Sequence, residues 1–331
     1  MELFDPKKLN FQFAKSFKYV VTVSVIISLV CLFAMFMKPG FKYGIDFRGG
    51  TEAVVGFKDA QVNTLQIRDV LNDKVPGLSI VEVENKQGQS EYKKEFLIIG
   101  ISENKESVAK AFEEGLAKFG TKNSEWTISK LDTVGPKVGG ELRHAALWSL
   151  IYTALLITLY IYLRFDARFA PGAMIAVVHD LLLTCGFLIF SKTEISTEVV
   201  AALLTLAGYS INDTVVVFDR IREVEHSMIG RTKAALIDYA VNSTLSRTMI
   251  TAAISLVSLA ILYFVGGVTL RDFSMTLFVG ILVGTYSSIF VAAPLYLWGD
   301  KYWGTSASTS SSPKKDDSKK LRSNKMKAAK A

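Results

Sequence analysis

Six long runs of apolar residues divide this 331-residue chain, and most of its charged residues lie between them. A helix needs about 20 mostly apolar residues to cross the hydrocarbon core of a bilayer, because each residue advances it by about 1.5 Å. Each run has roughly that length, so the pattern predicts a polytopic α-helical membrane protein with six transmembrane helices. The runs cover residues 19–37, 145–163, 170–190, 198–218, 248–265 and 274–298.

The long segment 38–143, between the first two runs, has a different pattern. Short runs rich in β-branched and aromatic residues predict strands, and two intervening stretches carry apolar residues at helical spacing. The predicted order is strand 51–57, helix 62–74, strand 78–84, strand 95–101, helix 106–119 and strand 125–132. The order βαββαβ predicts a small α+β domain of the ferredoxin-like type, and its length suffices for a soluble core.

The net charge of +7 belongs to the ends of the chain rather than to a folded face, so nucleic acid is not expected as a partner. Lys and Arg in the short loops indicate that both termini are cytoplasmic and that 38–143 is periplasmic. We therefore expect a cytoplasmic N-terminus at 1–18 and a membrane region at 144–298 that includes a cytoplasmic loop of one or two short helices at 219–246. The basic tail at 299–331 is expected to be disordered and attracted to anionic lipid.

Asp213 lies inside the fourth apolar run, where an ionisable side chain costs roughly 2.5–3.5 kcal/mol on insertion scales. Tyr209 and Ser210 precede it by one helical turn, while Gly208 and Asn212 mark an adjacent polar face. Burial favours the neutral acid and a nearby cation favours the carboxylate. Asp213 is therefore a candidate proton-relay residue supported by Tyr209, Ser210 and Asn212; the alternative is an aspartate that only locks helices together.

Arg247 is the candidate partner of Asp213. It precedes the fifth run and is expected near the cytoplasmic edge, with Asp213 about 9 Å deeper. Because guanidinium keeps its proton, Arg247 would hold the carboxylate rather than carry the proton; the alternative is an ordinary arginine at a helix end. Asp180, next to His179 in the third run, is a second relay candidate, and a structural hydrogen bond is its alternative role.

Glycines mark two further features of the chain. Gly280 and Gly284 form a GxxxG pair in the sixth run, which indicates close helix packing. Hinges are predicted where the outer segment joins the membrane region, because glycine permits tight turns there and no phosphate-loop signature follows. The hinge residues are Gly44, Asp46, Gly49 and Gly50 on one side and Gly135 and Pro136 on the other.

Metal and redox chemistry find no support in the sequence. Cys31 and Cys185 both fall in spanning runs and are expected to be small packing residues rather than a disulfide or a metal pair. No metal site and no bound cofactor are predicted.

Three motifs together resemble the SecF family of protein-export membrane proteins in the resistance–nodulation–division superfamily. They are GIDFRGG at 44–50, VGPKVGGELR at 134–143 and GYSINDTVVVFDRIRE at 208–223, and LSRT at 245–248 and GTYSSIF at 284–290 extend the likeness. The resemblance covers about residues 16–303.

The resemblance implies a non-enzymatic subunit of the bacterial inner membrane that uses the proton motive force to complete preprotein export. Its implied partners are SecD, YajC, the SecYEG translocon and the translocating preprotein, with protons as the coupling ion. By position, Asp213 and Arg247 match the family's proton-pathway residues.

Three other functions were weighed against this one. Half of an exporter of lipids or small molecules would normally carry larger outer loops. An intramembrane aspartyl protease using Asp180 and Asp213 would need YD and GxGD signatures, which the sequence around Asp213 lacks. A passive scaffold for the translocon would not need an intramembrane acid.

Overall fold

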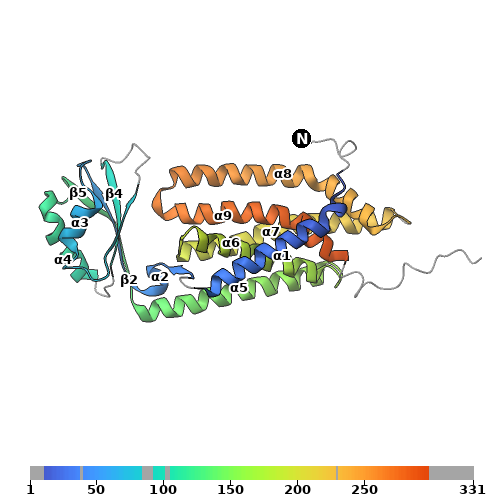
Figure 1. Ribbon diagram of the computed structural model, residues 1–331, viewed down its shortest axis with the longest axis horizontal. Coiled ribbons are helices and arrows are strands. Elements are labelled where there is room, and N and C mark those ends of the chain that lie inside the picture. The colour runs from blue at the N-terminus through green and yellow to red at the C-terminus, as the bar shows by residue number, and fades with distance from the viewer. Residues whose placement is uncertain (1–10, 38–39, 84–91, 101–104, 229, 298–331) are drawn as a thin grey trace, which may run out of the picture.

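The computed structural model describes residues 11–37, 40–83, 92–100, 105–228 and 230–297. A bundle of long helices forms most of the molecule, and a small domain containing a β-sheet lies at one end of its long axis (Figure 1). The first ten residues and the predicted tail at 299–331 lie outside the described residues.

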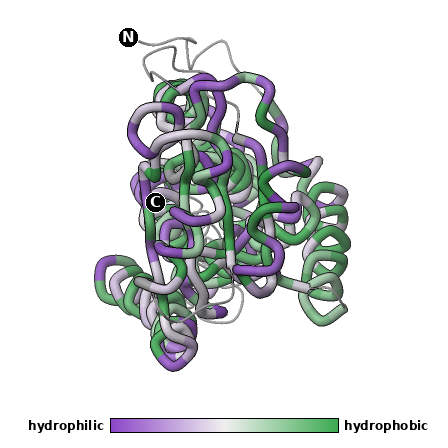
Figure 2. The backbone as a smooth tube through the Cα atoms, turned by 90° about the vertical axis from the view of Figure 1, so that its left-hand side faces the viewer, coloured by the Kyte–Doolittle hydropathy of each residue, from purple (hydrophilic) through white to green (hydrophobic). Residues whose placement is uncertain are grey.

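Six helices in the described chain are long and apolar enough to span a membrane, in agreement with the six predicted runs. In the end-on view of Figure 2, the helix at the right-hand edge is coloured mainly as hydrophobic. These six helices are α1 (Phe13–Phe36), α5 (Pro136–Arg164), α6 (Ala170–Phe190), α7 (Thr197–Ser227), α8 (Lys233–Val265) and α9 (Gly267–Ser287), and α9 continues through the π-helical turn η2 (Ser288–Ala292) to residue 297.

Three of the six spans form the centre of the bundle. Between 50% and 56% of the apolar stretch is buried in α6, α7 and the last span, compared with 6–17% in α1, α5 and α8. At one end, Phe169 stacks on Tyr296 with ring centroids 4.7 Å apart and also packs against Phe218 at 5.0 Å. Asp180 and Asp213, the two acids described below, therefore lie on two of the three most enclosed helices.

The small domain follows the chain order strand, helix, strand, strand, helix, strand. Its elements are β2 (Gly50–Phe57), α3 (Thr64–Leu71), β3 (Ser79–Val83), β4 (Lys94–Gly100), α4 (Lys105–Leu116), the short 3-10 helix η1 (Ala117–Phe119) and β5 (Trp126–Val134). The sheet is antiparallel with strand order β3-β4-β2-β5, and Ala53 is paired with Ile98 and Leu131. Both helices cover the face of the sheet that is turned away from the bundle (Figure 1).

One face of this sheet forms the domain core. Every second residue of β2 points into it, so Ala53, Val55 and Phe57 pack with Phe96 and Phe112. α3 begins with a capping box in which the side chains of Asn63 and Gln66 each bond the other residue's backbone N–H. Alternation in the strands and caps on the helices are the local reasons for this arrangement.

Residues 219–246 differ from the predicted loop with separate helices. α7 continues to Ser227 and α8 begins at Lys233, so both helical segments are extensions of the spans. Gly230, with φ of 87°, lies in the short turn between them, and the Thr232 hydroxyl accepts a hydrogen bond from the backbone N–H of Ala235 at the start of α8. The apolar residues of 219–246 repeat at helical spacing without an internal proline, so the helices have no reason to end at the membrane edge.

The α8 extension also holds the N-terminal end of α1. Asp238 Oδ1 accepts a hydrogen bond from the backbone N–H of Ala14 (2.8 Å), which satisfies a free donor at the start of that helix. Asn242 bonds both the N–H and the C=O of Phe11, at 3.2 and 2.8 Å.

Candidate functional site

Asp213 lies on the enclosed side of α7, with 3% of its surface exposed. α7 begins with an N-cap, because the Ser196 hydroxyl accepts a hydrogen bond from the N–H of Val199. The helix then runs unbroken and places Asp213 14 positions before its last residue, Ser227, or about 21 Å along the axis. Within the described part of the chain, no side chain makes a hydrogen bond or ion pair to this carboxylate.

Arg247 lies at the same depth as Asp213 rather than at the predicted edge. It follows the first residue of α8, Lys233, by 14 positions, and α7 and α8 are antiparallel neighbours joined by a short turn. Its guanidinium is close enough to attract the Asp213 carboxylate, but the two do not come within the 4.0 Å of an ion pair. Arg247 is exposed on the outside of the isolated chain.

Tyr209 joins α7 to α8 and does not contact Asp213. Its hydroxyl donates to the backbone carbonyl of Thr251 (3.1 Å) and contacts the hydroxyl of Ser255 (3.0 Å). Asn212 is exposed on the outer face of α7. Of the three predicted supporting residues, Tyr209 therefore fixes the helix pair that carries Asp213 and Arg247, whereas Asn212 faces away from the chain.

Asp180 is the centre of a buried polar network and is 1% exposed. Its Oδ2 accepts hydrogen bonds from the hydroxyls of Ser210 on α7 (2.5 Å) and Ser287 on α9 (2.8 Å). Its Oδ1 lies 2.9 Å from Nδ1 of His179. Ser210 therefore supports Asp180 rather than Asp213, so Asp180 of α6 contacts α7 one turn before Asp213.

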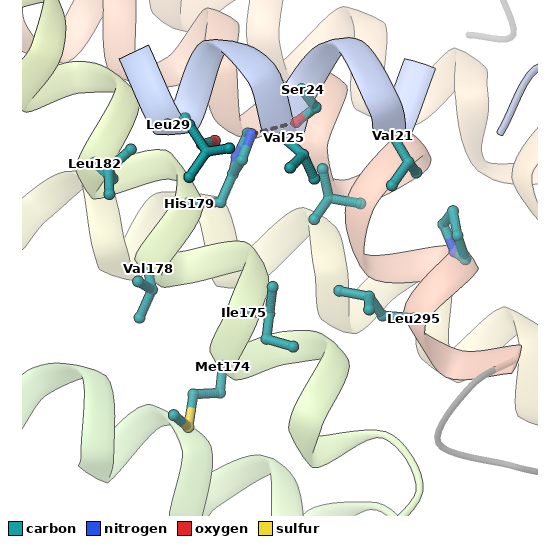
Figure 3. A pocket seen from close by; sticks show the side chains of 13 residues that line it. Val21, Ser24, Val25, Leu29, Met174, Ile175, Val178, His179, Leu182 and Leu295 are labelled. Carbon is teal, nitrogen blue, oxygen red and sulfur yellow. Dashed lines mark hydrogen bonds between the residues drawn. The ribbon is translucent and has the colours of Figure 1, made fainter. Parts of the chain in front are cut away.

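His179 extends this network to α1 and α9. Its Nε2 lies 2.6 Å from the Ser24 hydroxyl and 2.8 Å from the Tyr286 hydroxyl, and those two hydroxyls are 3.0 Å apart. Figure 3 shows His179 reaching from α6 to Ser24 on α1. Sequence reasoning missed these two partners, because nothing along the chain indicates which helices meet at His179.

The GxxxG glycines let α9 approach α7 closely. A Cβ at Gly280 would lie 2.5 Å from a methyl of Leu206. One turn on, a Cβ at Gly284 would lie 3.2 Å from the Cβ of Ser210 and 3.5 Å from Asp180 Oδ2. Small residues at these positions thus bring the α9 backbone up to the Asp180 carboxylate.

The segment after α1 is packed against the membrane helices through α2 (Ile45–Arg48) and the two-residue strand β1 (Lys42–Tyr43). β1 pairs in parallel with β6 (Glu194–Ile195), just before α7. Asp46 Oδ2 accepts hydrogen bonds from the backbone N–H (2.8 Å) and the hydroxyl (2.5 Å) of Thr197, the first residue of α7. The Gly44 N–H donates to the Ile195 carbonyl (2.8 Å).

The predicted hinge glycines lie at the point where this connector meets α5. Gly49 and Gly50 have φ of 79° and 138°, which lets the chain turn from α2 into β2. A Cβ at Gly49 would lie 2.9 Å from the backbone of Pro136, the first residue of α5, whose N-cap is Gly135. The two predicted hinges are therefore in contact with one another.

An ion-pair cluster that sequence reasoning did not single out ties together the far end of the bundle. Arg168, in the turn before α6, donates to Glu225 Oε1 (3.0 Å) and pairs with Asp166 (2.9 Å), and Tyr296 also donates to Glu225 (3.2 Å). Burial lowers the pKa of the Arg168 guanidinium, whereas the bonds to Glu225 and Asp166 raise it. The net shift of this pKa is upward. In the sequence alone, Arg168 is distinguished only as an arginine in a loop.

No group of three or more His, Cys, Asp or Glu side chains that could hold a metal ion occurs in the part of the chain that the structure describes.

Two family models match the chain. The model for "Protein export membrane protein SecD/SecF, C-terminal" matches residues 115–301, and the "SecD/SecF GG Motif" model matches residues 34–61, which include the paired glycines 49 and 50.

Similar proteins and structures carry related names. "Protein translocase subunit SecF" of Sebaldella termitidis is 40% identical over 278 residues, which cover 82% of this chain and 86% of that protein. The protein of the same name from Helicobacter pylori 26695 is 37% identical over 298 residues, or 90% and 89% of the two chains.

The crystal structure of SecDF, a translocon-associated membrane protein from Thermus thermophilus, matches 89% of this chain with a TM-score of 0.77 and 34% identity. This chain spans only 39% of the length of that SecDF chain. The family matches, the identities over most of the chain and the six spans lead to one conclusion: the chain is a multi-pass membrane protein that belongs to the SecF family of protein translocase subunits.

Proposed function

We propose that this chain acts with SecD as a non-enzymatic accessory subunit of the Sec machinery and uses the proton motive force to complete preprotein translocation. The observation that carries the proposal is the position of Asp213. A buried carboxylate lies about 21 Å inside a spanning helix, at the same depth as an arginine that attracts it without forming an ion pair.

The two charges can act as a proton-controlled attraction between α7 and α8. Asp213 is attracted to Arg247 when ionised and loses that attraction when it takes a proton, while Arg247 keeps its charge throughout. One charge that crosses 100 mV supplies about 2.3 kcal/mol. That amount can bias two helix arrangements that differ by a few kcal/mol, and Asp180 on α6 is proposed to take part in the same relay through its contact with Ser210.

The outer face of α7 and α8 supports a second subunit as partner. Thr205, Gly208 and Asn212 form an exposed stripe on α7, and Arg247 is exposed on α8. Lipid tails solvate none of these polar groups. SecD is proposed to cover them, which agrees with the likeness to SecDF. SecYEG, YajC and the preprotein are proposed as further partners.

The sheet domain is proposed to be a ferredoxin-like periplasmic module that moves with the membrane helices. Its strand order β3-β4-β2-β5 and its helices on one face support that assignment. The connector supports transmission, because Asp46 bonds the first residue of α7, the helix that carries Asp213. The proposed location is the inner membrane with both termini cytoplasmic, as the loop charges indicate.

The test is an Asp213→Asn variant, assembled with SecD and the translocon in vesicles with an imposed proton gradient. We expect the gradient-dependent part of export to be lost while the subunit remains folded and bound to SecD. Asp219→Asn is the matched control, because Asp219 lies six residues further along α7 and is exposed. Normal gradient-dependent export from the Asp213 variant would refute the proposed role.

A further inference from the structure

The network around His179 has a property that the proposed function does not use. Asp180 is a buried carboxylate, and the only ion-pair partner that the described residues give it is His179. A buried charge without compensation is costly. An ionised Asp180 beside a neutral imidazole carries one net negative charge, and a second proton on the imidazole would compensate it.

The hydrogen bonds around His179 are consistent with a histidine that can bind a second proton. Asp180 Oδ2 accepts two hydroxyl hydrogen bonds, and an ionised carboxylate has no proton to donate, so with Asp180 ionised Nδ1 of the imidazole is the donor to Oδ1. Nε2 then carries a lone pair in the neutral ring and a proton in the charged ring.

Three contacts join Nε2 to the hydroxyls of Ser24 and Tyr286 and those hydroxyls to one another. With a neutral ring, only two hydroxyl protons are available for the three contacts. A protonated Nε2 can donate to both hydroxyl oxygens, which frees a hydroxyl proton for the contact between Ser24 and Tyr286. Gain of a proton by Nε2 would therefore change which of these three contacts are hydrogen bonds.

Few other titratable groups face this site. On α6 it is Asp180, on α9 it is Tyr286, and on α7 the nearest is Asp213. α1 presents no charged residue between positions 19 and 36, and η2 contains none. His179 and Asp180 thus set the charge of the site.

α1 rests on the bundle along a narrow seam, and the His179 contact lies in the middle of it. The buried residues of α1 are Phe17, Ser24 and Cys31, seven positions apart. The two outer contacts are nonpolar: Phe17 packs edge-on against Phe290, and Cys31 occupies the space beside Gly186. Ser24 is the polar member of the seam.

On either side of this contact α1 and α6 are separated by an apolar groove of about 700 Å³, to which Val25, Ile175 and Val178 contribute (Figure 3). The hydrogen bonds of Ser24 lie beside this groove and join the middle of α1 to α6 and α9. α1 is the helix from which the chain continues toward β1 and α2.

We propose that His179 is a second proton-binding residue of this subunit and that Ser24 and Tyr286 make the seating of α1 depend on whether His179 holds that proton. Asp180 is the positioning residue, because it fixes the ring orientation and compensates its charge. The proposal deepens the proposed function by adding a second protonated state and a mechanical link through α1 to the outer domain.

Two native cysteines provide the readout. Cys31 on α1 and Cys185 on α6 are free and lie near each other. The yield of a disulfide between them under copper–phenanthroline oxidation, in vesicles that contain the full subunit with SecD, reports how α1 is seated on α6. The yield is compared between variants at each pH, which removes the pH dependence of the oxidation itself.

We expect the yield relative to His179→Gln to change by roughly tenfold between about pH 5.5 and about pH 8, the effect of one hydrogen bond to an ionised group. Ser24→Ala and Tyr286→Phe should reduce this change. Ser28→Ala should not, because Ser28 lies one turn along α1 in the same groove and its hydroxyl has no partner among the described residues.

Identical pH dependence in the wild-type chain and in His179→Gln would overturn the proposal, and so would equal effects of Ser24→Ala and Ser28→Ala. If His179→Gln does not assemble with SecD, the two hydroxyl variants decide the matter alone. Asp213→Asn separates this proposal from the one it rests on. That variant should lose gradient-driven export and keep the pH-dependent disulfide yield, whereas normal export with the yield unchanged would contradict only the proposed function.

Discussion

Two adjacent glycines at the start of α5 provide a test of how the outer domain is attached. A Cβ added to Gly139 would lie 3.0 Å from the carbonyl oxygen of Asp46, 3.1 Å from the carbonyl carbon of Phe47 and 3.2 Å from the nitrogen of Gly49. All three are backbone atoms of the connector and cannot rotate away. A Cβ on Gly140 would meet nothing within 4 Å.

The two alanine substitutions share one energy term and differ in the other. Both Gly139→Ala and Gly140→Ala favour the helix by up to about 1 kcal/mol, because alanine has the higher helix propensity. Gly139→Ala also forces α5 away from α2, and overpacking of this kind costs about 1–3 kcal/mol. Because the propensity term cancels, Gly139→Ala should be less stable than Gly140→Ala by about 1–3 kcal/mol.

Amide hydrogen exchange of the purified subunit is the direct assay. Gly139→Ala should speed exchange at the Gly44 and Thr197 N–H groups, whose hydrogen bonds hold the connector in place. Gly140→Ala should leave exchange there unchanged. Equal protection of these amides in the two variants would refute the view that the connector is wedged against α5.

Three further predictions concern residues outside the proton site. Arg168→Ala should destabilise the subunit by about 1.5–3 kcal/mol, which is the range for hydrogen bonds to a charged group. The effect would be measured as a lower melting temperature. An unchanged melting temperature would show that the cluster with Glu225 is dispensable. Asp46→Ala should cost about 1 kcal/mol, because the N–H of Thr197 at the start of α7 loses its hydrogen-bond acceptor, and Asp46→Asn should cost less. The loss would be seen as faster hydrogen exchange at the start of α7. Equal exchange in the two variants would contradict this role of Asp46. Burial raises the pKa of Glu95, so the folded domain holds this proton more tightly than the unfolded chain and gains stability as the pH falls through the raised pKa toward 4.5. Glu95→Gln should remove that part of the pH dependence of unfolding, and an unaltered pH profile would argue against a buried acid.

Several features of this protein follow from the sequence alone because they are local. A long apolar run in a bilayer has to be helical, since only a helix satisfies every backbone group within the segment, and six such runs are found as six helices. The predicted strand at 51–57 is found within β2 (Gly50–Phe57), whose β-branched and aromatic residues are mostly buried. An aspartate within an apolar run marks a candidate site for the same reason, because its depth in the bilayer, and so the approximate cost of placing it there, follows from its position in the run.

What the tertiary structure decided is which partner each polar group meets. Helical spacing places Ser210 on the face of Asp213, but packing of α6 and α9 gives its hydroxyl to Asp180. The depth of Arg247 depends on where α8 begins. The polar sequence before Arg247 did not indicate that this segment is part of one continuous helix. A contact between residues far apart in the chain, such as Ser24 with His179, leaves no periodic pattern in the sequence. The residues that flank each partner in the sequence are the same whether or not the contact forms.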